Sequence, residues 1–315
     1  MQKNKNDSLR NNNGRLIWAY LVHLSYNMWA DCELPHVNDG YYGAKSYLRF
    51  DVSLWNDMLG AIVSAGMNMV VIDLGDGVKY ESHPEIAVKD AWTVDQLKQE
   101  LKRLRKMGLE PIPKLNFSTC HDTWLGSYSR CVSTDRYYAV CRELIAEVIE
   151  LFDKPRFFHL GMDEETCEHQ RRYNYVVVRQ HDLWWHDLYF LFEEVQKGGA
   201  RPWIWSDYLW KNPDIFFNKM PRSILQSNWY YDKAFGEHIN PVKAYLDLEA
   251  HGYDQIPTGS NWTAPENFPN TVAFCEQHIA PERLLGFLQT TWKPTLEDCR
   301  EHHLQAIEKV AQVRN

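Results

Sequence analysis

Short apolar runs alternate with amphipathic stretches along almost the whole chain. Apolar runs bounded by polar turns are typical of buried strands, and apolar positions three or four residues apart are typical of helices. Between residues 94 and 107, for example, Leu97, Leu101 and Leu104 recur at helical spacing, with Lys and Arg on the other face. Gly108 follows at the position where a glycine commonly ends a helix. The pattern therefore predicts repeated strand–helix units.

Eight such units can be traced along the sequence. The predicted strands lie at 16–24, 68–74, 109–117, 157–162, 202–206, 224–229, 255–260 and 284–290. The predicted helices lie at 52–65, 94–107, 136–152, 181–196, 214–219, 242–250, 271–278 and 296–310. Eight strands, each followed by a helix, make up a (β/α)8 barrel, the TIM barrel of the α/β class. We expect one barrel domain over 15–315, preceded by a polar, Asn-rich and disordered segment at 1–14.

Composition narrows the class of partner. The formal net charge of -8 argues against a nucleic-acid partner, because phosphate binding requires clustered Lys and Arg. The chain contains 13 Trp and 17 Tyr, which suit a carbohydrate site, where aromatic rings form flat platforms for sugars, although large cores also use them. The seven cysteines form no CxxC pair, which favours reduced thiols.

The sequence contains no apolar run of membrane-spanning length, so we expect no membrane span. Its first residues have no apolar core of a signal peptide. This favours the cytoplasm, while the periplasm or secretion stays open if a signal has been removed. The sequence does not indicate the oligomeric state.

The end of the fourth predicted strand carries adjacent carboxylates. The apolar run from Phe157 to Met162 is followed directly by Asp163, Glu164 and Glu165. The C-terminal ends of barrel strands are where barrel enzymes carry out their chemistry. Carboxyl groups held partly out of water there can differ in pKa, so that one is protonated and its neighbour ionised. That arrangement is typical of an enzyme that cleaves sugars.

Other predicted strands also end in polar or aromatic side chains. Because all these ends meet at one mouth of a barrel, we expect the side chains to share one site. The candidate catalytic residues are Asp163 and Glu164, and the candidate substrate-binding residues are Asp76, His121, Trp205, Trp229, Tyr230, Trp262 and Trp292.

A metal site is an alternative for the residues that follow the fourth strand. His159, Asp163, Glu165, Cys167, Glu168 and His169 are all potential ligands. Their spacing matches no HExxH-type zinc signature, so we expect neither a metal nor another cofactor.

The sequence resembles the catalytic domain of glycoside hydrolase family 20, the β-N-acetylhexosaminidases, as a divergent member. The family's fourth strand carries His-x-Gly-Gly-Asp-Glu, and here the corresponding run is His159-Leu160-Gly161-Met162-Asp163-Glu164. The run from Asn68 to Asp76 is similar to the family's second strand, and the run from Pro111 to Asn116, followed by His121, to its third. Trp205, Trp229 and Trp292 fall where the family places the Trp residues of its sugar pocket.

The resemblance implies an exo-acting hydrolase of terminal N-acetylhexosamines with a substrate-assisted, retaining mechanism. In such a mechanism the substrate's own 2-acetamido oxygen attacks the anomeric carbon. Asp163 would orient the acetamido group, and Glu164 would protonate the leaving oxygen and then act as a base for water. Both acids reach one pocket only if the strand has ended before Asp163, because successive strand residues point to opposite faces.

Several positions depart from the family pattern. Met162 replaces the second glycine of the strand-four motif, and Lys114 and Asn116 replace acids on the third strand. The first strand lacks the family's sugar-binding Arg, which the nearby His23 cannot mimic, and Lys293 stands where an acid binds outer sugar hydroxyls. The seventh strand lacks the family's Tyr-x-Asp, so Tyr230 or Trp262 would have to contact the acetamido carbonyl. These changes concern the identity of the substrate more than the reaction class.

Two other functions stay open. One is a glycosidase of different specificity, in which Asp76 or Asp207 serves as an enzyme nucleophile beside Glu164. The other is a sugar-binding barrel that kept its Trp platforms and lost catalysis.

Overall fold

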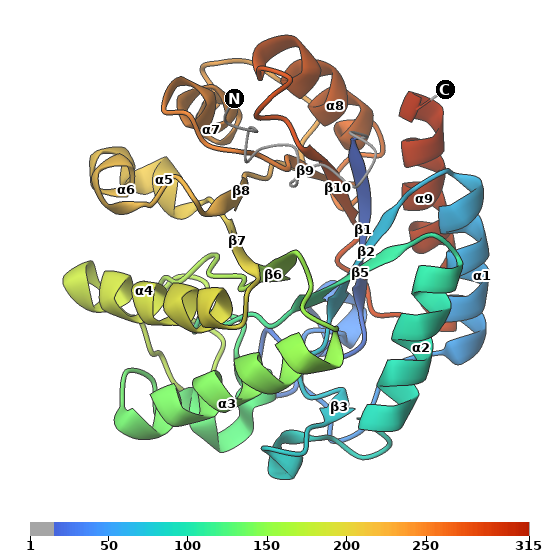
Figure 1. Ribbon diagram of the computed structural model, residues 1–315, viewed down its shortest axis with the longest axis vertical. Coiled ribbons are helices and arrows are strands. Elements are labelled where there is room, and N and C mark those ends of the chain that lie inside the picture. The colour runs from blue at the N-terminus through green and yellow to red at the C-terminus, as the bar shows by residue number, and fades with distance from the viewer. Residues whose placement is uncertain (1–15, 315) are drawn as a thin grey trace, which may run out of the picture.

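The computed structural model describes residues 16–314, which form a barrel of parallel strands surrounded by helices (Figure 1). The hydrogen-bonded order of its main sheet is β8-β7-β6-β5-β2-β1-β10-β9. These strands are β1 (Ile17–His23), β2 (Met69–Asp73), β5 (Glu110–Lys114), β6 (Phe157–His159), β7 (Arg201–Trp205), β8 (Leu225–Ser227), β9 (Thr258–Ser260) and β10 (Gly286–Thr290).

Backbone hydrogen bonds close the sheet between β8 and β9. Ile256 N donates to Gln226 O at 2.9 Å, and Thr258 N donates to Asn228 O at 2.9 Å. The predicted (β/α)8 barrel is confirmed. The predicted N-terminal disordered segment at 1–14 lies outside the described residues.

Helices follow the strands and pack around the barrel (Figure 1). They are α1 (Val52–Ser64), α2 (Val94–Lys106), α3 (Asp135–Leu151), α4 (His181–Lys197), α5 (Tyr208–Lys211), α6 (Pro213–Lys219), α7 (Asn240–Ala250), α8 (Asn267–His278) and α9 (Arg300–Arg314). The loops carry a short strand pair, β3 (Val78–Lys79) and β4 (Trp92–Thr93), and the 3-10 helices η2 (Asn38–Gly40), η3 (Pro84–Ile86), η4 (Thr123–Arg130) and η5 (Glu297–Cys299).

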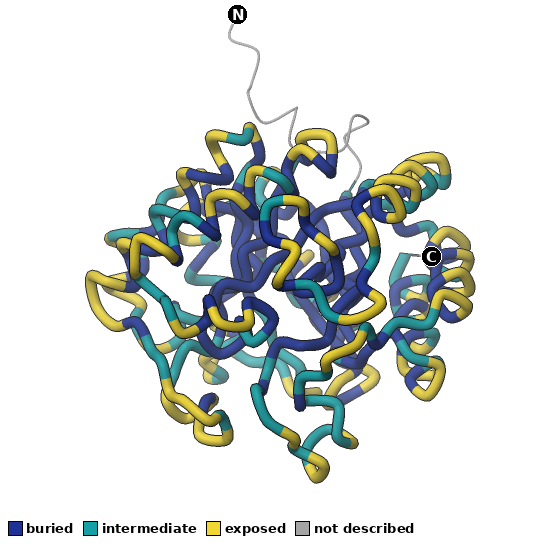
Figure 2. The backbone as a smooth tube through the Cα atoms, turned by 90° about the horizontal axis from the view of Figure 1, so that it is seen from below, coloured by how far each residue is buried: buried dark blue, intermediate teal, exposed yellow. Residues whose placement is uncertain are grey.

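The strands are buried on both faces (Figure 2). Along β1, Ile17, Ala19 and Leu21 join the cluster inside the barrel, while Trp18 and Tyr20 join the cluster that packs against the helices. This alternation follows from the two-residue period of a strand, and burial on both sides explains why the strands read as continuous apolar runs.

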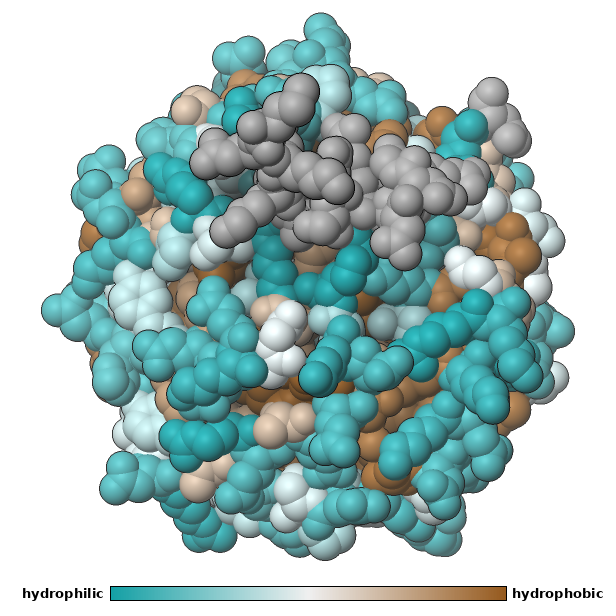
Figure 3. Space-filling model, viewed as in Figure 1, coloured by the Kyte–Doolittle hydropathy of each residue, from teal (hydrophilic) through white to brown (hydrophobic). Residues whose placement is uncertain are grey.

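The exterior is largely hydrophilic, with apolar side chains visible between polar ones on the face shown in Figure 3. Within 16–314, no helix combines the length and the apolarity that crossing a membrane requires. All seven cysteines lie in this part of the chain, and none forms a disulfide.

Six strands end earlier than predicted, and the difference is largest, at three residues, for β5 and β6. β5 stops at Lys114 rather than at residue 117, and β6 stops at His159 rather than at residue 162. Beyond β6, Gly161 and Met162 adopt φ of +71° and +75°, which turns the chain away from the sheet. The strand therefore ends before Asp163, which is the condition for adjacent acids to face one pocket.

Candidate active site

The turn after β6 positions the two acids. A Cβ atom on Gly161 would lie 1.9 Å from Oδ1 of Asn116, so only glycine fits there. The next residue, Met162, also has a left-handed backbone, which costs a non-glycine residue about 1–3 kcal/mol. Its backbone N–H donates to the same Asn116 Oδ1 at 3.1 Å, which holds the turn in place.

Asn116 connects this turn to the first acid. Its Nδ2 donates to Asp163 Oδ1 at 2.8 Å, while its Oδ1 also accepts from the backbone N–H of Ser118 at 3.0 Å. All three residues are buried. Asn116, which replaces a family acid in the sequence, thus serves as a neutral donor that fixes the Asp163 carboxylate.

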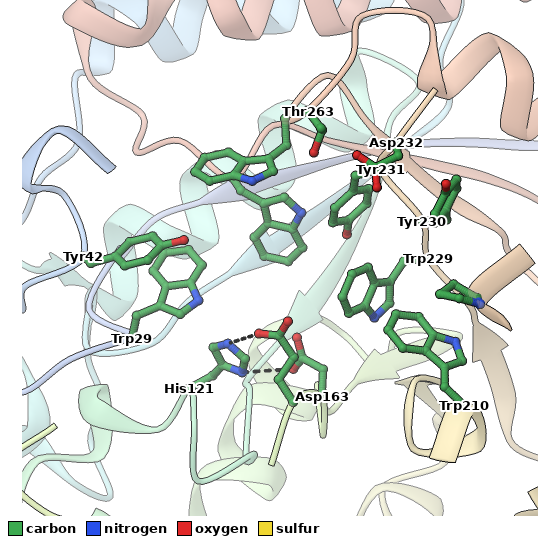
Figure 4. A pocket seen from close by; sticks show the side chains of 14 residues that line it. Trp29, Tyr42, His121, Asp163, Trp210, Trp229, Tyr230, Tyr231, Asp232 and Thr263 are labelled. Carbon is green, nitrogen blue, oxygen red and sulfur yellow. Dashed lines mark ion pairs between the residues drawn. The ribbon is translucent and has the colours of Figure 1, made fainter. Parts of the chain in front are cut away.

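His121 contacts both acids through its two ring nitrogens (Figure 4). Its Nδ1 is 3.2 Å from Asp163 Oδ1, and its Nε2 is 3.5 Å from Glu164 Oε2. Burial alone would lower the pKa of His121, but the charges and hydrogen bonds of the two carboxylates raise it to about 10. His121 is therefore an imidazolium at neutral pH.

A second histidine contacts the same glutamate. His169 Nε2 is 3.3 Å from Glu164 Oε1. Burial would raise the pKa of Glu164, but the hydrogen bonds from His121 and His169 hold this pKa well below its usual range. Burial likewise opposes ionisation of Asp163, but the neighbouring His121 charge lowers the pKa of this carboxyl. Both acids are ionised in the free protein.

Asp207 supports the site from β7 and α5. Its Oδ2 accepts the backbone N–H of Glu164 at 2.9 Å, and its Oδ1 faces Trp229 Nε1 at 3.4 Å. Burial and the negative charges of Asp163 and Glu164 raise the pKa of Asp207 to about 7. It is therefore partly protonated at neutral pH.

Asp163 and Glu164 line a cavity of about 370 Å³ (Figure 4). Most of its wall is aromatic, which suits the apolar face of a sugar ring. The lining residues are Trp29, Tyr42, His121, Asp163, Glu164, Trp210, Trp229, Tyr230, Tyr231, Asp232, Pro241, Trp262, Thr263 and Trp292. The structure thus brings seven of the nine candidate site residues from the sequence to one cavity.

The other two candidates lie outside this cavity. Asp76 is buried in the loop after β2, where it accepts hydrogen bonds from Ser25 Oγ and, at 2.8 Å, from Asn27 Nδ2. Burial raises the pKa of Asp76 to about 6. Trp205 belongs to the barrel interior, and its ring lies 5.9 Å from that of Trp292. It can support Trp292 from within the barrel but does not line the cavity.

Tyr231 is the most informative residue that the strand-end pattern missed. Its ring stacks on Trp229 at 5.0 Å, and its hydroxyl points into the cavity toward the carboxylates (Figure 4). Burial raises the pKa of Tyr231 well above its usual value, and the charges of Asp163 and Glu164 raise it by a smaller amount. The hydroxyl is thus a stable hydrogen-bond donor. The aromatic run 229–231 was the available signal in the sequence.

Trp29 and Tyr42 were also missed. They come from the long loop after β1 and stack on each other at 5.0 Å, and Trp29 packs edge-on against His121 at 6.0 Å. The loop has no periodic pattern, so sequence reasoning had no basis for placing it over the site.

The lysines that depart from the family pattern are paired. Lys114, fully buried inside the barrel, forms an ion pair with Asp73, which also lies 3.3 Å from His23 Nδ1. Lys293 Nζ pairs with Asp39 at 3.1 Å and lies over the ring of Trp262. Neither lysine lines the cavity.

The residues that could hold a metal differ from the cluster considered as an alternative in the sequence. One ligand atom each of His121, Asp163 and Glu164 lies within 4.8 Å of the others. Of the residues considered in the sequence, Glu165 instead pairs with Arg179 at 2.7 Å, and His159 packs 4.3 Å from the Trp205 ring.

No protein-family model and no curated protein matches the sequence. Solved structures do match. A β-N-acetylhexosaminidase from Bacteroides fragilis has a TM-score of 0.64 at 14% identity, over 93% of this chain and 65% of that chain. A chitobiase from Flavobacterium johnsoniae has a TM-score of 0.64 at 17% identity, over 94% and 48%.

A mutant β-hexosaminidase from Streptomyces plicatus, in complex with its product GlcNAc, has a TM-score of 0.63 at 13% identity, over 95% of this chain and 64% of that chain. A β-N-acetylglucosaminidase described as a glycoside hydrolase of family 20 also matches, with a TM-score of 0.63 at 10% identity, over 94% and 69%.

The chain has the barrel fold of glycoside hydrolase family 20.

The chain spans between about half and two thirds of the length of three of the matched chains (65%, 48% and 64%). The low identity agrees with a divergent sequence, in which Met162, Lys114 and Asn116 replace residues of the family motifs.

Proposed function

We propose that the protein is an exo-acting glycoside hydrolase that releases terminal β-linked N-acetylhexosamine by substrate-assisted catalysis. The observation that carries this proposal is the adjacent pair Asp163 and Glu164, bridged by His121 at the base of an aromatic cavity. The cavity is of a size and character that suit one sugar residue. The family 20 fold supports the reaction class.

In this mechanism the acetamido group of the substrate is held from two sides. The ionised Asp163 carboxylate accepts the acetamido N–H, and Tyr231 donates its hydroxyl proton to the acetamido carbonyl oxygen. That oxygen then attacks the anomeric carbon as the glycosidic bond breaks. We assign this hydrogen bond to Tyr231 rather than to Tyr230 or Trp262, the two donors suggested by the sequence. The reason is that the Tyr231 hydroxyl points toward the carboxylates (Figure 4).

Glu164 moves the proton in both half-reactions. It donates a proton to the leaving oxygen, then removes one from the water that opens the cyclic intermediate. In the free protein Glu164 is ionised, so it must gain a proton once substrate is bound. A sugar that excludes water from the cavity raises the pKa of Glu164, and the His121 imidazolium, 3.5 Å away, is a nearby proton source.

The alternative of an enzyme nucleophile has less support. Both carboxylate oxygens of Asp207 face donors, the Glu164 N–H and the Trp229 indole, and the raised pKa of Asp207 weakens it as a nucleophile. Asp76 lies outside the cavity among its own hydrogen bonds. A non-catalytic sugar-binding barrel would not need two adjacent ionised acids at the floor of its pocket.

The first test is hydrolysis of 4-nitrophenyl β-N-acetylglucosaminide and β-N-acetylgalactosaminide, with the β-glucoside as a control substrate. We expect turnover of at least one acetamido sugar and none of the glucoside. Glu164→Gln and Asp163→Asn should each lower kcat/KM by about 10²–10⁴-fold, because each removes a group that acts in the transition state.

Glu193→Gln, on the exposed face of α4, is the matched control and should keep wild-type kcat/KM. Hydrolysis of the glucoside at a comparable rate would contradict substrate assistance. No turnover of any of these substrates would contradict the proposed glycosidase.

A further inference from the structure

A second cavity, of about 310 Å³, adjoins the sugar cavity at Glu164. Both cavities are lined by Trp29, Tyr42, His121 and Glu164, so the acid stands at their boundary. The remaining lining residues of the second cavity are Leu34, Cys120, Glu168, His169, Arg171, Arg172 and Tyr173.

The position of Glu164 indicates which part of a substrate the second cavity would hold. A general acid must lie beside the glycosidic oxygen, with the cleaved sugar on one side and the leaving group on the other. If the aromatic cavity with Asp163 and Tyr231 holds the acetamido sugar, the leaving group lies across Glu164, in the second cavity. The stacked pair of Trp29 and Tyr42, shared by both cavities, can then contact both sugars.

One of the charged side chains that line the second cavity has no partner of opposite charge among residues 16–314. Glu164 faces His169 at 3.3 Å, and Glu168 forms an ion pair with Arg171. Arg172 remains, and no Asp or Glu among residues 16–314 lies within ion-pair distance of its guanidinium. Burial raises the pKa of Tyr42, which lines the cavity, and the charge of Arg172 opposes this rise. The Arg172 charge is therefore felt inside the cavity. The second cavity therefore offers one unmatched, fork-shaped cation.

We propose that the second cavity is the leaving-group subsite and that Arg172 makes it selective for a leaving sugar bearing an oxyanion, a carboxylate or a sulfate. This inference rests on the proposed function. A guanidinium binds either oxyanion through two parallel hydrogen bonds, which a neutral hydroxyl cannot match. The substrate class is thus a glycan in which a terminal N-acetylhexosamine is linked to an acidic sugar.

Three aryl β-N-acetylglucosaminides (or galactosaminides, whichever the protein turns over) test the proposal: 4-carboxyphenyl, 4-sulfophenyl and the neutral 4-carbamoylphenyl glycoside. For each anionic probe, kcat/KM is divided by that of the neutral probe. The ratio is compared between wild type and Arg172→Met, because differences in leaving-group reactivity cancel in this comparison. The two anionic probes distinguish a carboxylate site from a sulfate site.

We expect the wild-type ratio for at least one anionic probe to exceed the Arg172→Met ratio about fivefold, the effect of a partly exposed ion pair. Added NaCl should reduce the difference, because salt screens exposed charges. Arg172→Lys should keep only part of the preference. Arg171→Met is the matched control and should leave the ratio near that of wild type, because the Arg171 charge is already neutralised by Glu168.

Ratios within twofold of each other in wild type and Arg172→Met would overturn the proposal, even if every probe is hydrolysed. An equal loss of preference in Arg171→Met would also overturn it, since the effect would then belong to the general charge of the loop. Failure of wild type to hydrolyse any acetamido probe would instead overturn the proposed function, and this inference with it.

Discussion

Single side chains set the charge state of the site. His121 binds both acids at once, so its proton keeps two adjacent carboxylates from repelling each other. Asn116 adds a neutral donor to Asp163, where an acid would have added a third negative charge. Asp207 is the exception, because burial and its two ionised neighbours favour its protonated form.

The pKa of Asp207 predicts a pH-dependent stability. Its folded-state pKa, about 7, lies above the usual aspartate pKa of 3.8, so the fold favours the protonated form. The stability that this preference contributes is present below pH 4 and is lost as pH rises through 7. Asp207→Asn mimics the protonated form. We expect its free energy of unfolding, relative to wild type, to rise by about 2 kcal/mol between pH 4 and pH 8.

Urea unfolding of wild type and Asp207→Asn at a series of pH values measures this difference. Asp214→Asn, on the exposed side of α6, removes the same charge elsewhere and serves as the control. A difference between Asp207→Asn and wild type that stays constant from pH 4 to pH 8 would contradict the assigned pKa.

Secondary-structure elements deliver these side chains to one place. β6 is only three residues long in the structure, because the chain leaves the sheet at Gly161. The left-handed backbone at 161 and 162 then directs Asp163 and Glu164 to the same cavity. The sequence predicted the strand and its acids from their local pattern. It could not predict where the strand ends, because that depends on contact with Asn116, which lies on another part of the barrel.

Two constraints act on Gly161, its left-handed backbone and the close approach of Asn116, and glycine substitutions can separate them. Gly161→Ala would meet both a left-handed φ and a clash with Asn116, whereas Gly108→Ala would meet only a left-handed φ of +79° in open space. We expect Gly108→Ala to lower the free energy of unfolding by about 1 kcal/mol. Gly161→Ala should cost at least about 3 kcal/mol, because Asn116 and its hydrogen bonds must shift as well.

Chemical denaturation of the two variants measures these costs. Equal losses of unfolding free energy in both would show that the approach of Asn116 to Gly161 adds nothing to the requirement for glycine.

At the scale of the whole molecule, the number and order of the strand–helix units could be predicted from the sequence. Each strand and each helix has its own local spacing of apolar positions. Strand ends also located seven of the fourteen residues that line the cavity, since parallel strands all end at one mouth of the barrel. The strand ends did not indicate which of their side chains reach the cavity. Asp76 and Trp205 were therefore predicted to bind substrate, although both lie outside the cavity. Trp29 and Tyr42 depend on the path of a long loop, which no local pattern encodes.

The most direct test of the account uses aryl β-N-acetylglucosaminides (or galactosaminides) whose acetamido group carries zero, one, two or three fluorine atoms. Each fluorine weakens the carbonyl oxygen as a nucleophile while changing the sugar little. If the acetamido oxygen attacks the anomeric carbon between Asp163 and Tyr231, kcat/KM should fall steeply and progressively along the series. A rate that hardly depends on fluorination would contradict substrate assistance and would favour an enzyme carboxylate as the nucleophile.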